Sequence, residues 1–237
     1  MTSSRSYLAL LIFCISVPIA FGITYVVSVS NGDIPAFFPY ISDTGTLPPA
    51  SCIFGQFVDI GTALIFFICL IRYYHIKCLI MSRRSKNMIN WNKFSFIFGN
   101  ISCLGLSLVG NFQFTNQFIL HSIGAVLSFG GLFIYINIQI YISKYFASEL
   151  KLKNWVHIYR LVFICLSTIS SIISSIFLVI SFSKFDGEDR LQWKPTDSGF
   201  VEHVISSSSE WVFVLLLIMV FASFTNEFKQ IESVKFN

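Results

Sequence analysis

The sequence predicts an all-α integral membrane protein, with six transmembrane helices in a compact bundle and both termini in the cytosol. Two observations on composition point to a membrane: hydrophobic residues make up 54% of the 237 residues, and charged residues only 12%. A soluble domain carries about 25% charged residues, so this chain has too few charges to cover a surface exposed to water. The third observation is a series of apolar stretches long enough, or nearly so, to cross the roughly 30 Å hydrocarbon layer.

The first apolar stretch, residues 7–29, is expected to be a retained transmembrane helix. It follows Arg5, as the apolar core of a signal peptide would. Such a core has about 7–15 residues and precedes a cleavage site of small residues. This run has 23 residues and no such site before Ser30. We therefore interpret it as the first span.

Five further spans are predicted along the rest of the chain. The third is interrupted by Asn100, Asn111 and Gln113, and the sixth is short but strongly apolar over VFVLLLIMVFASF. No internal repeat or soluble domain is recognisable, so residues 1–237 are expected to form one six-span membrane domain. The five later spans are expected at residues 53–73, 94–114, 118–142, 159–182 and 210–224.

Small residues predict how the third and fourth spans pack. Lipid provides no hydrophobic drive for helix association, so close approach of backbones and hydrogen bonds must supply it. The third span offers Gly99 and Gly105, and the fourth offers Gly124 and Gly131. These positions predict tight contact between helices.

The distribution of Lys and Arg predicts the orientation. One side of the membrane receives 13 of the 16 cations and the other receives 3, namely Lys184, Arg190 and Lys194. Cytosolic loops carry the excess of Lys and Arg, so both termini are expected in the cytosol. The opposite face, lumenal or extracellular, then carries the loop before the second span and the loop of residues 183–209.

The loop before the second span is the most individual part of the chain. Residues 37–55 read FFPYISDTGTLPPASCIFG and contain no Lys or Arg. Asp-Thr-Gly is expected to form a turn, and Pro-Pro is expected to stiffen the return to the membrane. The candidate functional residues in the two lumenal loops are Tyr40, Asp43, Thr44, Gly45, Pro48, Pro49, Trp193, Pro195 and His203.

A second candidate site is a polar cluster inside the membrane. It comprises Asp59 in the second span, Asn111 and Gln113 at the end of the third, and His121 at the start of the fourth. An acid within a span is by default a functional hypothesis because burying its charge is expensive. The cluster is interpreted either as a proton- or cation-responsive or lipid-headgroup site, or as a hydrogen-bonded network that fixes helix register.

No pattern of residues supports catalysis or a bound cofactor. By the predicted topology, His75 and His157 face the cytosol while His121 and His203 face the lumen, so they cannot form one metal site. The sequence contains no Gly-x-Ser-x-Gly elbow, HExxH motif or phosphate-binding loop. We expect no catalytic residue, cofactor or metal. The net charge of +4 is divided by membrane side, so no nucleic-acid partner is expected.

Several short strings combine into a resemblance that covers essentially the whole chain. They are PYISDTGTLPPASCIFG, ISCLGLSLVGNFQ, HSIGAVLSFG, LQWKPTDSGFVEHVISSSSEW and FTNEFKQI, in this order. In these strings the chain resembles the DNA-damage-regulated autophagy modulator (DRAM) family. That family lies within a broader superfamily of six-span proteins, which includes the FGF-receptor-activating protein and a factor acting on the lipid of GPI anchors.

The resemblance implies a non-enzymatic, multi-pass protein of lysosomal or other endomembranes that promotes autophagy, in some members with a link to cell death. The plasma membrane is an alternative location. Membrane lipids and proteins of the autophagy and lysosomal pathway are the implied partners. Two alternative functions remain at this point: an ion, proton or small-solute transporter using the polar cluster, and a lipid-binding or lipid-remodelling protein akin to the GPI-anchor branch.

Overall fold

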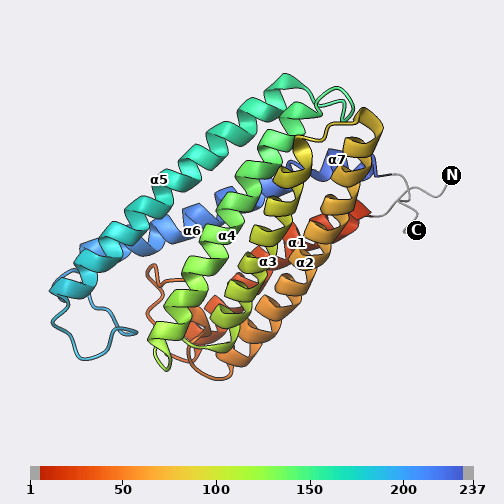
Figure 1. The fold of residues 1–237 in the computed structure, drawn as a ribbon. Coiled ribbons are helices and arrows are strands. Elements are labelled where there is room, and N and C mark those ends of the chain that lie inside the picture. The colour runs from red at the N-terminus through yellow and green to blue at the C-terminus, as the bar shows by residue number, and fades with distance from the viewer. Residues whose placement is uncertain (1–5, 232–237) are drawn as a thin grey trace.

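The computed structural model describes residues 6–231, and this part of the chain is helical without any strand. Six of its helices are long and apolar enough to cross a membrane. The predicted six-helix membrane fold is therefore confirmed (Figure 1). The long helices are α1 (Ser6–Ser30), α2 (Ala50–Arg83), α3 (Met88–Asn111), α4 (Phe118–Tyr145), α5 (Asn154–Lys184) and α6 (Phe200–Ala222). A 3₁₀ turn, η1 (Asp43–Gly45), lies between α1 and α2, and a short helix, α7 (Thr225–Lys229), follows α6.

Two helices are longer than the apolar stretches that predicted them. Helix α2 continues past residue 73 until Arg84 adopts a left-handed conformation, with φ of 54°, and donates its N–H to the Ile80 carbonyl. Helix α6 begins after Gly199, whose φ is +87°. Its first ten residues therefore precede Glu210, where the sixth span is predicted to start. The membrane limits within each helix stay a prediction.

Glycine allows α3 and α4 to pack with their backbones in near contact. A Cβ atom on Gly105 would lie 2.2 Å from the Ser128 nitrogen, and one on Gly131 would lie 2.9 Å from the Phe98 carbonyl oxygen. Neither position has room for a larger residue. The close packing predicted from these glycines is confirmed.

The helices divide into two groups that separate toward one end of the molecule. Helices α2, α3 and α4 lie side by side, while the α5–α6 hairpin leans away from α4 (Figure 1). At the other end, the start of α1 meets α7, where the Ser6 hydroxyl donates to the Phe228 carbonyl at 3.1 Å.

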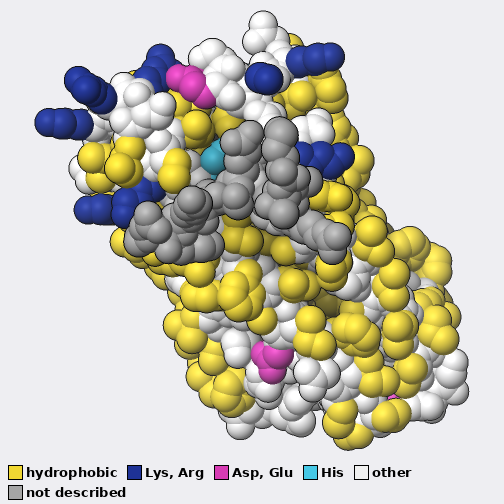
Figure 2. Space-filling view, turned by 90° about the vertical axis from the view of Figure 1, so that its right-hand side faces the viewer, with side chains coloured by type: hydrophobic (Ala, Val, Ile, Leu, Met, Phe, Trp, Pro, Cys, Tyr) yellow, Lys and Arg dark blue, Asp and Glu magenta, His cyan; other side chains and the backbone are white. Residues whose placement is uncertain are grey.

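We call the two ends of the bundle the basic end and the cap end. The basic end carries the α2–α3 and α4–α5 loops and α7, and Figure 2 shows Lys and Arg gathered there above a largely hydrophobic surface. The cap end carries residues 31–49 and residues 185–199, which together we call the cap. Two of the cations counted above, Arg5 and Lys235, lie outside the described residues.

The outer faces of α1 and α5 are apolar. Side chains of Ile, Val and Leu along both helices are exposed, as expected for surfaces in contact with lipid tails. The core instead lies between the helices, around Leu10, Ile65 and Ile136, each no more than 1% exposed. The exposed apolar residues of α1 and α5 include Ile12, Ile15, Ile19, Ile23, Val26, Ile158, Leu161, Ile169, Ile172, Ile176 and Val179.

Candidate functional site

Side chains of the loop before α2 hydrogen-bond to the backbone of the same loop. The Asp43 carboxylate accepts the Tyr40 N–H at 3.1 Å, and the Thr44 hydroxyl donates to the Ile41 carbonyl at 2.7 Å. They support the 3₁₀ turn at the predicted Asp-Thr-Gly, whose backbone bond runs from the Gly45 N–H to the Ser42 carbonyl at 3.1 Å. Gly45 packs against the ring of Phe54, where a Cβ would lie 2.3 Å from Cγ. The turn therefore requires glycine at its last position.

The same loop is fixed to α1 through Thr44. The hydroxyls of Thr24 and Thr44 are 3.0 Å apart, and the Ser28 hydroxyl donates to the Thr44 carbonyl at 2.9 Å. Thr24, Ser28 and Thr44 have no solvent exposure. Pro48 and Pro49, by contrast, are exposed, are joined by a cis peptide bond, and precede the first turn of α2.

Helix α6 holds the other side of the loop. The Glu210 carboxylate accepts the Ile41 N–H at 2.8 Å. The Trp211 indole donates to the Pro39 carbonyl at 2.9 Å, and the Ser207 hydroxyl donates to the Phe38 carbonyl at 2.6 Å. Phe38, Pro39 and Ile41 of the loop are thus held by side chains of α6.

The two loops of the cap meet at a buried aromatic stack. The Trp193 ring lies flat on the His203 imidazole, with centroids 4.4 Å apart, and Tyr40 meets the same imidazole edge-on at 5.0 Å. All three are 5% exposed or less. Sequence reasoning selected these residues without placing them in contact. Pro195 lies in the same loop but is exposed.

Two carboxyl groups lie at the cap, Asp43 within it and Glu210 of α6 directly beneath it. Asp43 is 4% exposed, and burial, followed by the nearby charge of Glu210, raises the pKa of its carboxyl well above its usual value, while the Tyr40 N–H opposes the shift. Burial likewise raises the pKa of the Tyr40 phenol. Among the ion pairs of residues 6–231, none involves Asp43 or Glu210. The cap therefore contains acidic groups without a paired cation.

The predicted intramembrane cluster is only partly brought together. The Asn111 amide donates to both oxygens of Asp59, at 3.1 and 3.2 Å, and the Ser107 hydroxyl approaches Asp59 at 3.4 Å. Gln113 instead accepts from Asn116 in the α3–α4 turn, and His121 contacts the Phe112 carbonyl through Nδ1 at 2.7 Å. Asp59 is partly exposed at the α2–α3 seam rather than enclosed.

A cavity of about 200 Å³ lies under the cap, between α1, α2, α3, α4 and α6. Its walls are mainly Phe, Leu, Ile and Val. His121 and Glu210 are the titratable side chains among its lining residues, and Ile41 and Ser42 of the cap loop also line it. The cavity joins one member of the predicted cluster to the cap, which the sequence did not indicate.

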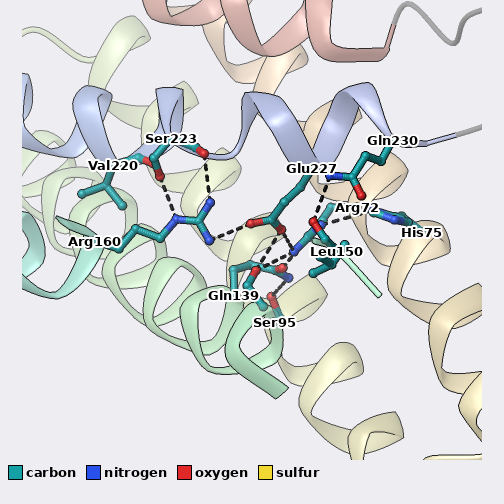
Figure 3. Close-up of polar contacts among 11 residues, drawn as sticks. Arg72, His75, Ser95, Gln139, Leu150, Arg160, Val220, Ser223, Glu227 and Gln230 are labelled. Atoms are coloured by element: carbon teal, nitrogen blue, oxygen red, sulfur yellow. Dashed lines mark hydrogen bonds and ion pairs between the residues drawn. The ribbon is translucent and has the colours of Figure 1, made fainter. Parts of the chain in front are cut away.

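A buried ionic cluster at the opposite, basic end was missed entirely (Figure 3). Glu227 of α7 accepts from Arg72 of α2 and pairs with Arg160 of α5, whose Nη1 lies 2.7 Å from Oε1. The three side chains are 1% exposed or less. The orientation count treated Arg72 and Arg160 as loop cations, which is wrong. Without them, eleven cations still oppose three.

Neutral groups complete the hydrogen bonding of this cluster. Arg72 donates to the Gln139 amide oxygen at 2.9 Å and to the Ser143 hydroxyl at 2.8 Å. Arg160 donates to the hydroxyl and carbonyl of Ser223, at 2.8 and 2.9 Å. The sequence signals that could have indicated this cluster were Arg72 and Gln139, which lie within apolar runs. Charges inside spans are normally paired.

The similarity of this chain to known proteins extends over most of its length. A family profile described as "Frag1/DRAM/Sfk1/Cwh43P N-terminal domain" matches residues 5–231. The chain belongs to this family. The resemblance drawn from the sequence strings is therefore confirmed, and the cap, the cavity and the ionic cluster are features of a Frag1/DRAM/Sfk1 family member.

Relatives within the Frag1/DRAM/Sfk1 family carry names that refer to autophagy. The chain is 33% identical over 214 residues to "DNA damage-regulated autophagy modulator protein 2" of Homo sapiens, covering 90% of this chain and 80% of the relative. It is 32% identical to the corresponding protein 1 of Xenopus laevis, covering 87% and 83%. It is 30% identical to "Modulator of macroautophagy TMEM150B" of Bos taurus, covering 96% and 88%. No solved structure matches the chain.

Proposed function

We propose that this protein is a multi-pass membrane modulator of autophagy, acting in lysosomal or other endomembranes as a regulator rather than as an enzyme. The observation that carries the proposal is membership, over residues 5–231, of a family whose relatives are named as autophagy modulators. Six membrane-spanning helices agree with that role, since they place the protein in a membrane.

In this proposal the basic end faces the cytosol and the cap faces the lumen. Support comes from the Lys and Arg side chains gathered at the end opposite the cap (Figure 2), as cytosolic loops require. Two exposed cysteines provide a test, Cys78 near the basic end and Cys52 near the cap end. A membrane-impermeant maleimide should label Cys78 from the cytosol and Cys52 only after the lumen is opened. The reverse pattern would overturn the orientation.

The cap is the surface through which we propose the protein acts. Phe38 has a positive φ of 44°, which is rare for a bulky residue. Backbone strain of this kind persists only where surrounding contacts fix it, and it concentrates at functional sites. Here Ser207 and Trp211 hold the carbonyls of Phe38 and Pro39, and the exposed rings of Phe37 and Phe38 are presented outward.

The role in autophagy is tested by complementation. Cells that lack the gene should show altered lysosome-dependent turnover of long-lived proteins during starvation, and the wild-type chain should restore it. A variant combining Ser207→Ala and Trp211→Phe loosens the cap and should restore turnover poorly. The matched control is Ile172→Ala on the outer face of α5, which should restore it fully. Normal turnover without the gene would contradict the proposal.

A further inference from the structure

The cavity beneath the cap has the size and lining of a site for hydrocarbon. Its volume is about 200 Å³, and most of its walls are apolar side chains of α1, α2, α4 and α6. An apolar cavity of roughly 150 Å³ in a protein core is sufficient to bind benzene. The present cavity is therefore large enough for a segment of an aliphatic chain.

The cavity reaches the lipid-facing side of the bundle at the seam between α1 and α2. Ile12 and Ile60 both line the cavity, and they are 53% and 47% exposed. Nearer the cap, the rings of Phe21 and Phe54 close the same seam, with centroids 5.9 Å apart. Ile12 lies six residues into α1, about 9 Å from its first residue. A ligand that enters between Ile12 and Ile60 therefore comes from the membrane and not from the lumen.

The unused polar groups of the cavity lie at its cap end. Two of its serines, Ser16 and Ser128, donate to carbonyls of their own helices. Near the cap, the Phe112 carbonyl accepts from His121 Nδ1, which leaves Nε2 of the neutral ring as an acceptor. Glu210 adds a carboxylate, and neither Lys nor Arg lines the cavity. These groups suit an uncharged hydrogen-bond donor, whereas a phosphate would face an unpaired acid.

We propose that the cavity binds the acyl chain of one bilayer lipid whose polar end is an uncharged hydroxyl. The chain enters from the membrane through the α1–α2 seam, and the hydroxyl donates to His121 or Glu210 beneath the cap. The inference goes beyond the role in autophagy and rests on the cavity alone, so failure of either proposal leaves the other standing.

Photochemical capture tests the site directly. The full-length protein in vesicles of phosphatidylcholine would be irradiated with a diacylglycerol that carries a diazirine in its acyl chain. A phosphatidic acid with the same chain serves as the charged comparison. We expect the diacylglycerol probe to label peptides of residues 12–21 and 54–65, and unlabelled diacylglycerol or ceramide to compete. Equal labelling by the phosphatidic acid probe would overturn the assignment of an uncharged polar end.

Three variants distinguish the cavity from general contact with lipid. Ala125→Leu adds volume to the cavity wall on α4 and should lower labelling of these peptides by at least about fivefold, because overpacking a filled site is unfavourable. Ala63→Leu makes the same change on an exposed position of α2 that does not line the cavity, and it should change nothing. Ile60→Trp places a larger side chain at the opening of the cavity. Residue 60 faces the lipid and has room for it, so the variant should fold and the labelling should slow.

The measurements also exclude trivial explanations. Gel filtration and thermal unfolding in detergent show whether each variant is folded. If Ala125→Leu does not fold, Ile60→Trp tests the proposal in its place. Labelling that is equal in all variants, or that falls on the outer face of α5 instead, would overturn the proposal. So would recovery of the probe cross-linked only to a second protein, because that result assigns the seam to a partner helix.

Discussion

At the basic end of the bundle, the charges of Arg72, Glu227 and Arg160 contact one another, whereas beneath the cap Asp43 and Glu210 are held by backbone N–H groups alone. Both regions bring together segments distant in the chain. At the basic end, the ionic cluster joins α2, α5 and α7, and its hydrogen bonds are completed by Gln139, Ser143 and Ser223. At the cap, neither acid has a paired cation within residues 6–231, and one of them, Glu210, lines the cavity.

This difference separates a structural site from a candidate binding site. A buried cluster whose charges are paired with one another offers a ligand no unpaired charge, and its removal mainly affects folding. Groups beneath the cap keep acceptor capacity and adjoin a space that a ligand can occupy. The cluster at the basic end therefore fixes α7 to the bundle, and the cap end is where recognition is expected.

The largest predicted effect is at the basic end. Glu227→Gln leaves Arg72 and Arg160 buried without a counter-charge, which should lower the free energy of unfolding by about 3–5 kcal/mol. Thermal unfolding in detergent measures the loss. The control is Glu149→Gln, which removes an exposed pair with Arg83 at 3.3 Å and should change stability by about 0–1 kcal/mol. Equal stability of the two variants would contradict the assigned role of the cluster.

The second prediction concerns pH at the cap. The pKa of Asp43 is raised in the folded state, so folding favours its protonated form, and this stabilisation is lost as pH rises from the unfolded pKa toward the folded one. Within that window the free energy of unfolding should fall by about 1.4 kcal/mol per pH unit. The cap should accordingly resist proteolysis better at acidic than at neutral pH. In Asp43→Asn this dependence should weaken, because the contribution of Asp43 is removed.

Asp186 provides the matched control for this pH dependence. It is an exposed acid of the other cap loop, and hydrogen bonds from Ser198 lower the pKa of its carboxyl. Its contribution to the free energy of unfolding is present above the unfolded pKa and is lost as pH falls. This pH dependence is opposite in sign to that of Asp43. Asp186→Asn should therefore leave the loss of protection at neutral pH intact. If Asp43→Asn behaves in the same way, the pH effect does not come from Asp43.

The third prediction concerns a variant that weakens the contact between the cap and α6. Trp211→Phe removes the hydrogen bond to the Pro39 carbonyl while keeping an aromatic ring beside Phe21. The expected loss is about 0.5–1.5 kcal/mol. It should appear as faster amide exchange in residues 38–45 with no change at the basic end. Uniformly faster exchange throughout the bundle would show that the cap does not open as a separate unit.

The sequence predicted most of the fold because apolar length and glycine positions act locally. Six apolar runs gave the helices, and Gly105 and Gly131 gave the α3–α4 contact. The Asp-Thr-Gly turn was also predicted from its residues. The contacts of Glu210 were not predicted. The apolar run alone placed Glu210 at the start of the sixth span, whereas α6 begins ten residues earlier, at Phe200, and carries Glu210 within the helix.

The unpredicted features depend on how distant helices are arranged. Arg72 and Arg160 each lie near the end of an apolar run, where a cation is usually exposed at the membrane surface, and only the return of α7 across the bundle buries them against Glu227. The cavity depends on how five helices, α1, α2, α3, α4 and α6, are arranged around it. Neither property is encoded in the periodicity of a single segment.

The smallest predicted effect is at Asp59, and it decides whether the membrane contains a third functional region. Asp59 is partly exposed at the α2–α3 seam and receives hydrogen bonds from the Asn111 amide. Asp59→Asn keeps the shape and exchanges charged hydrogen bonds for neutral ones, so stability should change by about 0.5 kcal/mol or less, as at other surface positions. Unfolding in detergent measures this change.

The same variant tests the transport alternative. Because His121 and Gln113 contact other groups, Asp59 does not belong to a continuous polar path with them, and the purified protein in vesicles should show no cation or proton flux that depends on residue 59. His121→Phe, which alters the cavity instead, should reduce lipid capture without affecting flux. A flux present in the wild type and abolished by Asp59→Asn would reverse the comparison, because the functional charge would then lie at the α2–α3 seam and not beneath the cap.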